Sequence, residues 1–295
     1  MSALRGTRRG GANASASGAL ASGACPPVCP PLYIGVRLRL RLRLLTNLPQ
    51  GDDPEFSVVI LGYGEGDRLP SIVASIDSAT ATLGVSYEMV LIANYWPGAG
   101  DRTPDVAAQL AQQNDRLKVI AKPKAGGMGW DMRCGLEAAR GNILAVIDGD
   151  GQIQSDDIVK AYRELRRNEL DLCQTYRIDR RDGWERRATS RIYNLLFRIV
   201  FPGVPLDDIN AKPKLMTRAL YNLLQLTSSD WFIDAEIIVQ ARRLGRRMGQ
   251  IPSTFGRKEG KSYVTVFTIL EFLRNLVVFR VRETLSHSKG PWRRR

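Results

Sequence analysis

Histidine and cysteine are scarce in this chain. One histidine, His287, and four cysteines occur among its 295 residues. A Ser-His-Asp or Cys-His catalytic unit needs a histidine in the folded body, and this one lies close to the C-terminus. The cysteines do not form the two pairs of the usual structural zinc sites, and four are too few for a disulfide scaffold at this length. These absences exclude such zinc sites and argue against a histidine-dependent hydrolase.

Acidic residues are missing from both ends of the chain. Residues 1–50 contain seven arginines and no acid, and residues 289–295 contain four basic residues and no acid. The stretch between them is nearly neutral, so the formal net charge of +13 comes from the ends. This distribution weakens the case for a nucleic-acid partner, and we expect none. Charged ends of this kind are either solvated tails or contacts for an anionic partner.

Residues 1–54 form a basic N-terminal extension that we expect to be disordered, because it offers little to bury. Within it, residues 36–44 alternate apolar residues and arginine strictly. This repeat fits an edge strand, a basic arm on a membrane, or a segment without stable structure, and we favour the last. The arginine-rich, serine-rich and acid-free composition is also typical of an organellar transit peptide. The folded body is expected to begin near Glu55.

The body alternates apolar runs with helical patterns. Such alternation predicts an α/β domain with a mostly parallel sheet that helices cover on both faces. In that architecture ligands bind outside the carboxyl ends of the strands, so the loops after the first, second and fourth strands are the places to examine. Strands are predicted at 56–61, 88–93, 117–121, 143–147 and 170–176, and helices at 67–83, 101–113, 126–139 and 155–168, with Ser155 as N-cap.

The loop after the fourth predicted strand is the most informative segment. The apolar run 143–147 ends in Asp148-Gly149-Asp150-Gly151-Gln152. Two carboxylates one residue apart in a glycine-rich loop can converge on one hard cation, which prefers oxygen ligands and can bridge to phosphates. A solvated Asp-Gly turn is the alternative interpretation. The position at a strand's carboxyl end favours the metal site.

Several blocks of the sequence, in order over residues 56–262, resemble family 2 glycosyltransferases. They are similar above all to the branch that contains dolichol-phosphate mannosyltransferase and other polyprenyl-phosphate sugar transferases. The resemblance implies the nucleotide-sugar-binding GT-A fold. The blocks are Tyr63 and Glu65; Asp101-Arg102-Thr103; Gly127, Gly129, Gly135, Ala138, Ala139 and Gly141; Asp148, Asp150 and Gln152; Lys214-Leu215-Met216-Thr217-Arg218; Asp230-Trp231-Phe232, Asp234 and Glu236; and Gly245, Ile251-Pro252, Arg257, Gly260, Lys261 and Ser262.

This resemblance implies a metal-dependent, inverting enzyme that moves a sugar from a nucleoside-diphosphate sugar to a polyprenyl phosphate. Asp148 and Asp150 would take part in catalysis by holding Mg²⁺ or Mn²⁺. The carboxylates of Asp234 and Glu236 would position the acceptor. The acceptor phosphate would lie among Arg218, Arg257 and Lys261, and donor binding would fall to Tyr63, Glu65, Asn94, Asp101, Lys124, Gly127 and Gln152.

The sequence departs from the family pattern in the first two loops. Leu61 and Gly64 replace the usual Pro and Asn, and Ala93 and Asn94 replace the paired acids expected to hold the base and ribose. Asn94 can still hydrogen-bond a nucleotide, but it brings no charge. The alternatives are a soluble glycosyltransferase acting on a small molecule or a glycan, and a catalytically weak nucleotide-sugar-binding protein.

Residues 263–295 are expected to form an amphipathic helix and a basic tail beyond the catalytic domain, which would span 55–262. The segment 264–281 is mostly apolar, but Glu271 and Arg274 lie in its middle. Each charge at the centre of a membrane helix costs about 2.5–3.5 kcal/mol on insertion scales. We therefore expect a helix lying on the membrane surface or against a small membrane partner, and a cytoplasmic, peripheral protein. Packing on the protein's own core is the alternative.

Overall fold

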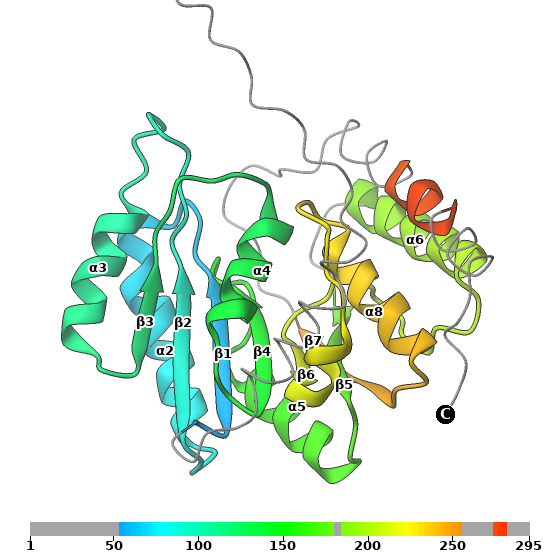
Figure 1. Ribbon diagram of the computed structural model, residues 1–295, viewed down its shortest axis with the longest axis horizontal. Helices are drawn as coiled ribbons and strands as arrows, with labels where there is room; N and C mark the ends of the chain where they lie inside the picture. Colours follow the sequence, from blue (N-terminus) through cyan, green and yellow to red (C-terminus); the bar gives the residue numbers. More distant parts are fainter. Residues whose placement is uncertain (1–52, 180–183, 255–273, 282–295) are drawn as a thin grey trace, which may run out of the picture.

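The computed structural model describes residues 53–179, 184–254 and 274–281, and a seven-stranded sheet forms its centre (Figure 1). The strand order is β3-β2-β1-β4-β6-β5-β7. β6 is antiparallel to both of its neighbours, and the other neighbouring pairs are parallel. The predicted α/β fold with a mostly parallel sheet is confirmed. The strands are β1 (Phe56–Leu61), β2 (Tyr87–Ile92), β3 (Leu117–Ile120), β4 (Ile143–Asp148), β5 (Leu172–Asp179), β6 (Lys214–Thr217) and β7 (Met248–Thr254).

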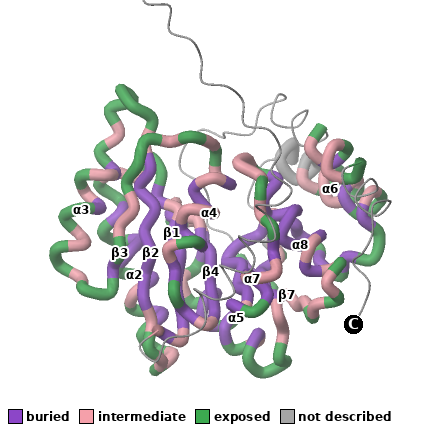
Figure 2. The backbone as a smooth tube through the Cα atoms, viewed as in Figure 1, coloured by how far each residue is buried: buried purple, intermediate pink, exposed green. Residues whose placement is uncertain are grey.

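Helices cover both faces of the sheet because its central strands are apolar on both sides (Figure 2). In β1, Val59 packs into the core beneath α4 and α8, whereas Val58 and Ile60 pack into the core beneath α2 and α5. Side chains alternate between the faces of a strand, so a strand buried on both sides reads as a continuous apolar run. The helices are η1 (Gly66–Arg68), α2 (Leu69–Ala81), α3 (Thr103–Gln113), α4 (Met128–Ala138), α5 (Asp156–Arg167), α6 (Trp184–Val200), α7 (Arg218–Leu223) and α8 (Ile233–Arg243).

The later elements depart most from the sequence prediction. The pattern did not predict α6 and α7, and it gave no direction to β6. β6 is only four residues long and begins with a buried lysine, Lys214, so it lacks the apolar run that marks the earlier strands. Ser155 does precede α5, but its side chain does not cap the helix. Its hydroxyl instead forms a hydrogen bond with that of Ser75 at 2.8 Å.

Residues 274–281 form a helix that packs on the protein's own core. Leu276 is buried, and Phe279 stacks against Phe232 just before α8, with ring centroids 5.2 Å apart. Asn275 donates to Asp230 Oδ2 at 2.7 Å. For this part of the predicted 264–281 helix, the structure therefore favours the core-packing alternative on one side. Residues 264–273 lie outside the described residues.

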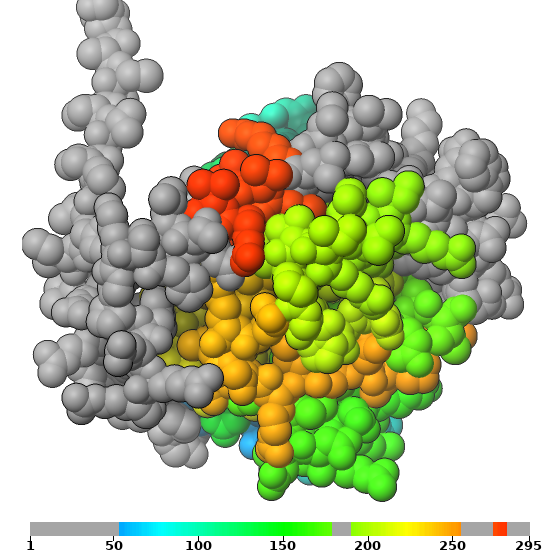
Figure 3. Space-filling model, turned by 90° about the vertical axis from the view of Figure 1, so that its right-hand side faces the viewer, coloured from blue at the N-terminus to red at the C-terminus, as the bar shows by residue number. Residues whose placement is uncertain are grey.

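The same helix leaves its other side uncovered by described residues. Val277 is 60% exposed, and the helix lies beside α6 (Figure 3). None of the helices within the described ranges combines the length and the apolar character needed to cross a bilayer. The division of the chain at residues 54 and 262 stays a prediction.

Arg218 lies at the wrong end of the sheet for its expected role at the acceptor phosphate. Its guanidinium is buried and donates to the carbonyls of Gly141 at 3.0 Å and Ala139 at 2.7 Å. The preceding residue, Thr217, pairs with the first residue of β4, Ile143. β4 runs for about 16 Å from there to Asp148, at roughly 3.3 Å per residue. The antiparallel direction of β6 thus turns Arg218 into a structural residue, and it is left out of the candidate site.

Replacing Arg218 by methionine should lower the free energy of unfolding by about 2–4 kcal/mol, because two buried carbonyls would lose a charged donor. Chemical denaturation would measure this loss. The matched control is Arg167→Met, which removes an exposed arginine at the end of α5 and should leave stability nearly unchanged. An Arg218→Met protein as stable as the parent but defective in acceptor binding would contradict the structural assignment.

Candidate functional site

The carboxyl ends of β1, β2 and β4 meet at one edge of the sheet, and the acidic loop folds over it. Leu61 lies beside both Ile92 and Asp148 in the strand register. The backbone N–H of Gly149 donates to the carbonyl of Leu61 at 2.9 Å. A Cβ at position 149 would lie 2.8 Å from that oxygen, so the close approach requires glycine. The structure thus brings Asp148 and Asp150 to the edge where the sequence predicts ligand binding.

Backbone contacts shape the acidic loop itself. Asp150 Oδ1 accepts from the backbone N–H of Gln152 at 3.1 Å, and Arg68 Nη2 donates to the Asp150 carbonyl at 3.2 Å. Gln152 therefore contributes to the loop through its main chain. A hollow of about 240 Å³ lies beside Asp148, between α2 and the start of α5, and its polar lining consists of Arg68, Ser71, Ser75, Asp148 and Ser155.

Asp148 and Asp150 fit a metal ion that the substrate helps to bind. Mg²⁺ prefers oxygen ligands and usually takes one or two protein carboxylates together with phosphate oxygens and water. Within the described ranges, no group of three or more His, Cys, Asp or Glu side chains is arranged to hold a metal. The side chain of Asp148 is 35% exposed. The edge therefore offers an open carboxylate pair that suits a substrate-bridged cation better than a closed protein site.

Behind the acidic loop lies a network of buried charges that the sequence analysis missed. Lys212 Nζ lies 3.1 Å from Asp234 Oδ2 and 3.3 Å from Asp148 Oδ1. Lys214 Nζ lies 2.7 Å from Asp234 Oδ1. The side chains of Asp234, Lys212 and Lys214 are all at most 2% exposed. The carboxylate of Asp234 is therefore paired with two lysines and does not face an acceptor. This corrects the expectation that Asp234 positions the acceptor.

The pKa shifts favour the charged forms of Lys212 and Asp234, whereas burial lowers the pKa of Lys214. Burial alone would lower the pKa of Lys212, but the carboxylates of Asp148 and Asp234 outweigh it and raise that pKa. Burial likewise opposes the ionisation of Asp234, yet the two lysines hold its pKa below the usual range. Burial also raises the pKa of Asp148; Lys212 opposes this rise, and Asp150 and Asp234 add to it. Lys212 is thus a fixed cation directly behind the acidic loop.

Glu236 also has an internal role. Its carboxylate is 1% exposed and accepts from the backbone N–H of Thr227 at 3.0 Å, from the Thr227 hydroxyl at 2.9 Å, and from the backbone N–H of Ser228 at 2.9 Å. A carboxylate that accepts several backbone N–H bonds holds a loop in place. This corrects the expectation that Glu236 positions the acceptor.

A second buried network occupies the loop after β2. Asn94 is 1% exposed, donates to Asp131 Oδ1 at 2.8 Å and accepts from the backbone N–H of Lys122 at 2.9 Å. Asp131 also forms an ion pair with Lys124, and both side chains are almost fully buried. Asn94 and Lys124 therefore bind other residues of the chain, and Asn94 is not placed to contact a base or ribose. Asp131 is a participant that the sequence analysis missed.

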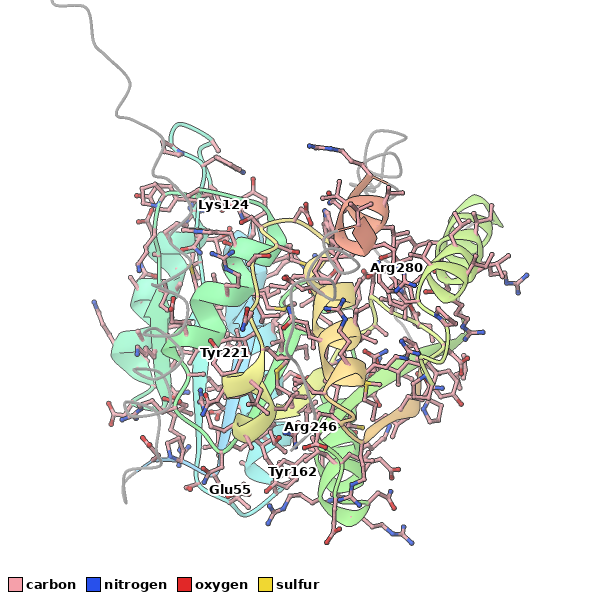
Figure 4. The ribbon with its side chains drawn as sticks, turned by 45° about the vertical axis from the view of Figure 1, so that its right-hand side comes forward. Glu55, Lys124, Tyr162, Tyr221, Arg246 and Arg280 are labelled. Carbon is pink, nitrogen blue, oxygen red and sulfur yellow. The ribbon has the colours of Figure 1, made fainter. Side chains whose placement is uncertain are left out.

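Tyr63, Glu65 and Asp101 lie around the same edge. Tyr63 is 40% exposed, and Lys124 Nζ lies 4.5 Å from its ring centroid; Figure 4 shows Lys124 at the end of the molecule opposite Glu55. Glu65 pairs with Arg68 at 3.3 Å. Asp101 Oδ1 accepts from the backbone N–H of Thr103 at 2.9 Å, whereas its Oδ2 is buried without a hydrogen-bond partner among the described residues.

Gly127 begins α4 at the same edge, and the glycines there allow two loops to touch. The backbone N–H of Trp130 donates to the Ser229 carbonyl at 3.2 Å. A Cβ at Gly129 would lie 2.4 Å from the Asp230 carbonyl oxygen. The glycines therefore serve first to pack the start of α4 against residues 228–230, and no side chain caps the helix at Gly127. Arg257 and Lys261, expected at the acceptor phosphate, lie outside the described residues.

Lys212 could have been suspected from sequence alone. It forms part of Lys212-Pro213-Lys214, directly before the apolar pair of β6. Two lysines beside a buried strand are unusual, because lysine is almost never fully buried unless it is paired. The pattern does not name the partners, since Asp148 and Asp234 are distant in sequence.

Solved structures share this architecture. The chain is similar to mannosyl-3-phosphoglycerate synthase from Rubrobacter xylanophilus, with a TM-score of 0.61, 16% identity, and coverage of 86% of this chain and 80% of that one. It is also similar to glucosyl-3-phosphoglycerate synthase from Mycobacterium tuberculosis in complex with Mn²⁺, UDP-glucose and phosphoglyceric acid, with a TM-score of 0.59, 16% identity, and coverage of 86% and 85%. At these identities the likeness concerns the fold alone.

Curated relatives match by sequence. The chain is 28% identical over 207 residues to "Glycosyltransferase AglD" of Haloferax volcanii, covering 67% of this chain and 32% of that protein. It is 23% identical over 250 residues to dolichyl-phosphate beta-glucosyltransferase ALG5A of Trichomonas vaginalis, covering 80% and 75%. It is 25% identical over 224 residues to undecaprenyl-phosphate 4-deoxy-4-formamido-L-arabinose transferase of Edwardsiella ictaluri, covering 75% and 66%. The chain thus spans about a third of AglD and about two thirds of the Edwardsiella protein.

One family model covers the region that contains the sheet edge and its loops. The model "Glycosyl transferase family 2" matches residues 57–231, which is more than half of the chain. The resemblance stated from the sequence is therefore confirmed, and the chain belongs to glycosyl transferase family 2.

Proposed function

We propose that the chain transfers a sugar from a nucleoside-diphosphate sugar to a polyprenyl phosphate. The observation that carries the proposal is the convergence of Asp148 and Asp150 at the carboxyl end of β4, beside the loops after β1 and β2, within a family 2 glycosyltransferase domain. Two relatives named for dolichyl-phosphate and undecaprenyl-phosphate support the acceptor. A cytoplasmic, peripheral location remains a prediction.

Asp148 and Asp150 would hold Mg²⁺ or Mn²⁺, which neutralises the charge of a departing diphosphate. Lys212 fixes the carboxylate of Asp148 from behind, at 3.3 Å. Tyr63, Glu65, Asp101 and Gly127 stay candidates for donor binding because they surround the same edge. Gln152 stays a candidate through its main-chain contact in the acidic loop, and Lys124 through its place beside the Tyr63 ring. Asn94 leaves this group because both of its described hydrogen bonds are internal.

The internal commitments of Asp234 and Glu236 support an acceptor that is already ionised. A hydroxyl acceptor needs a general base within hydrogen-bond reach, whereas a phosphate oxygen carries its charge before the reaction. Asp234 is paired with two lysines, and Glu236 accepts from Thr227 and Ser228. The phosphate oxygen would attack the anomeric carbon opposite the leaving diphosphate and invert its configuration. Neither Asp234 nor Glu236 is therefore positioned to act as such a base, which agrees with a phosphate acceptor.

Replacing Asp150 by asparagine should reduce the transfer rate about a hundredfold or more, since stabilisation of the leaving group by a metal is worth several kcal/mol and about 1.4 kcal/mol is tenfold. Formation of extractable lipid-linked sugar would measure the rate. The Mg²⁺-dependent rise in Tm with a nucleoside-diphosphate sugar should also disappear. Asp156→Asn, an exposed acid in the first turn of α5, is the matched control. If Asp150→Asn transfers sugar at the parental rate, the assignment of Asp150 to the metal site is wrong. If the parent binds nucleoside-diphosphate sugars without turnover, the chain is a nucleotide-sugar-binding protein.

Replacing Asp234 by asparagine should destabilise the fold by about 3–5 kcal/mol, because it leaves buried ammonium groups without their carboxylate. The pKa of Asp234 is lowered in the folded state, so its contribution is present above about pH 4 and is lost as pH falls below that value. The variant should lack this part of the acid sensitivity in denaturation experiments. Glu169→Gln, which removes an exposed partner of Arg247, is the control.

The same variant tests the argument for an ionised acceptor. Folded Asp234→Asn protein should keep the pH profile of transfer seen in the parent. A normally stable variant whose rate falls and whose profile loses its acid limb would instead identify Asp234 as a general base.

A further inference from the structure

Exposed apolar side chains gather on two neighbouring helices, α6 and the helix 274–281, which follow the acidic loop in the sequence. On α6, Ile192, Leu195 and Ile199 are 58%, 59% and 66% exposed, and on the helix 274–281, Val277 and Val281 are 60% and 48% exposed. The spacing of three and four residues places the α6 group on one side of that helix. We call these five side chains the apolar face. Exposed apolar side chains that gather on neighbouring helices are a candidate interaction site.

The two helices lie side by side, as Figure 3 shows. Phe201, just beyond α6, contacts Phe279 with ring centroids 6.3 Å apart, and the Arg280 guanidinium lies 5.8 Å from the Phe201 ring centroid. Each helix uses a different side for the protein core, since Phe197 and Leu276 are buried. The apolar face is therefore additional to the residues that hold the helices in place.

Arginine is the only charged residue type within residues 190–200 of α6 and within 274–281. These arginines are Arg191, Arg198, Arg274 and Arg280. Arg198 pairs with Asp207, which lies outside both helices. Apolar side chains bordered by arginine complement a surface that is apolar inside and anionic outside, which is the chemistry of a bilayer with acidic headgroups.

We propose that the apolar face lies on an anionic lipid surface, with its side chains inserted among the acyl chains and its arginines at the headgroups. The proposal concerns the surface that the chain binds. It rests on the proposed function in one respect, since a polyprenyl phosphate acceptor would be found in that lipid surface. A short chain of contacts connects the helix 274–281 to the candidate site. Asn275 binds Asp230, whose carbonyl packs on Gly129 at the start of α4, and Phe279 stacks on Phe232, two residues before Asp234.

The test is flotation of the full chain with phosphatidylcholine vesicles that either contain or lack phosphatidylserine, in the absence of any polyprenyl phosphate. The triple variant Ile192→Ser, Leu195→Ser and Ile199→Ser is compared with the parent. Ile178→Ser is the matched control, because Ile178 is 59% exposed on β5. The parent and the control should float with the anionic vesicles. The triple variant should show a partition coefficient lower by roughly a hundredfold or more, because three inserted aliphatic side chains would be lost.

Equal flotation of the triple variant and the parent would overturn the proposal, since the basic termini would then account for binding. Absence of parental flotation, or equal flotation on vesicles without phosphatidylserine, would overturn it as well. A change from dimer to monomer in the triple variant, with vesicle binding unchanged, would show that a second copy of the chain covers the face. Because the substituted side chains are exposed, the parent and the triple variant should unfold at similar temperatures.

A second assay separates this proposal from the proposed function. Transfer to a short-chain, water-soluble polyprenyl phosphate should be the same in the parent and the triple variant. A parent that floats but does not transfer contradicts the proposed function and leaves the lipid face supported. A parent that transfers while the triple variant floats unchanged contradicts the lipid face alone.

Discussion

The carboxylate of Asp234 is fully buried and must be neutralised, and the residues that neutralise it connect several elements of the structure. Asp234 sits at the start of α8 with no exposure to solvent, where an isolated charge would be prohibitively costly. Lys212 and Lys214 neutralise it from the segment that leads into β6, and Lys212 also reaches Asp148 at the end of β4. One set of charges therefore joins a helix, an antiparallel strand and the acidic loop. The direction of β6 matters because it brings both lysines to the carboxyl end of β4.

The same requirement explains why several polar residues serve the fold instead of the ligand. Glu236, Asn94 and Arg218 are buried, and each hydrogen-bonds main-chain or side-chain groups of neighbouring loops. Buried polar groups are costly unless they are hydrogen-bonded, so the chain uses them to fix the loops around the sheet edge. Asp148, Asp150 and Tyr63 differ from these residues because they keep partial contact with solvent. The candidate site thus consists of partly exposed side chains that lie over buried, hydrogen-bonded polar residues.

The buried charges behind the acidic loop and the apolar face belong to the same side of the sheet. α4 and α8, which border the buried charges, share one hydrophobic core with Phe197, Phe201 and Leu276 from α6 and the segments next to it. The residues that hold α6 and the helix 274–281 in place therefore belong to the same core as α4 and α8. This arrangement would let one layer of helices carry membrane contact, while the other layer, α2 and α5, borders the hollow beside Asp148.

Local signals in the sequence were sufficient for β1 to β5 and the acidic loop. β1 to β5 were predicted because strands buried on both faces need uninterrupted apolar runs, and Asp148-Gly149-Asp150 marks where one of them ends. The family resemblance was also readable, since its residues recur in order along the chain. Tertiary structure alone decided the roles of Arg218, Asp234, Asn94 and Lys212. The reason is physical: the free energy of a buried charge or amide depends on its partner, and Arg218 finds its carbonyl partners 77 and 79 residues away.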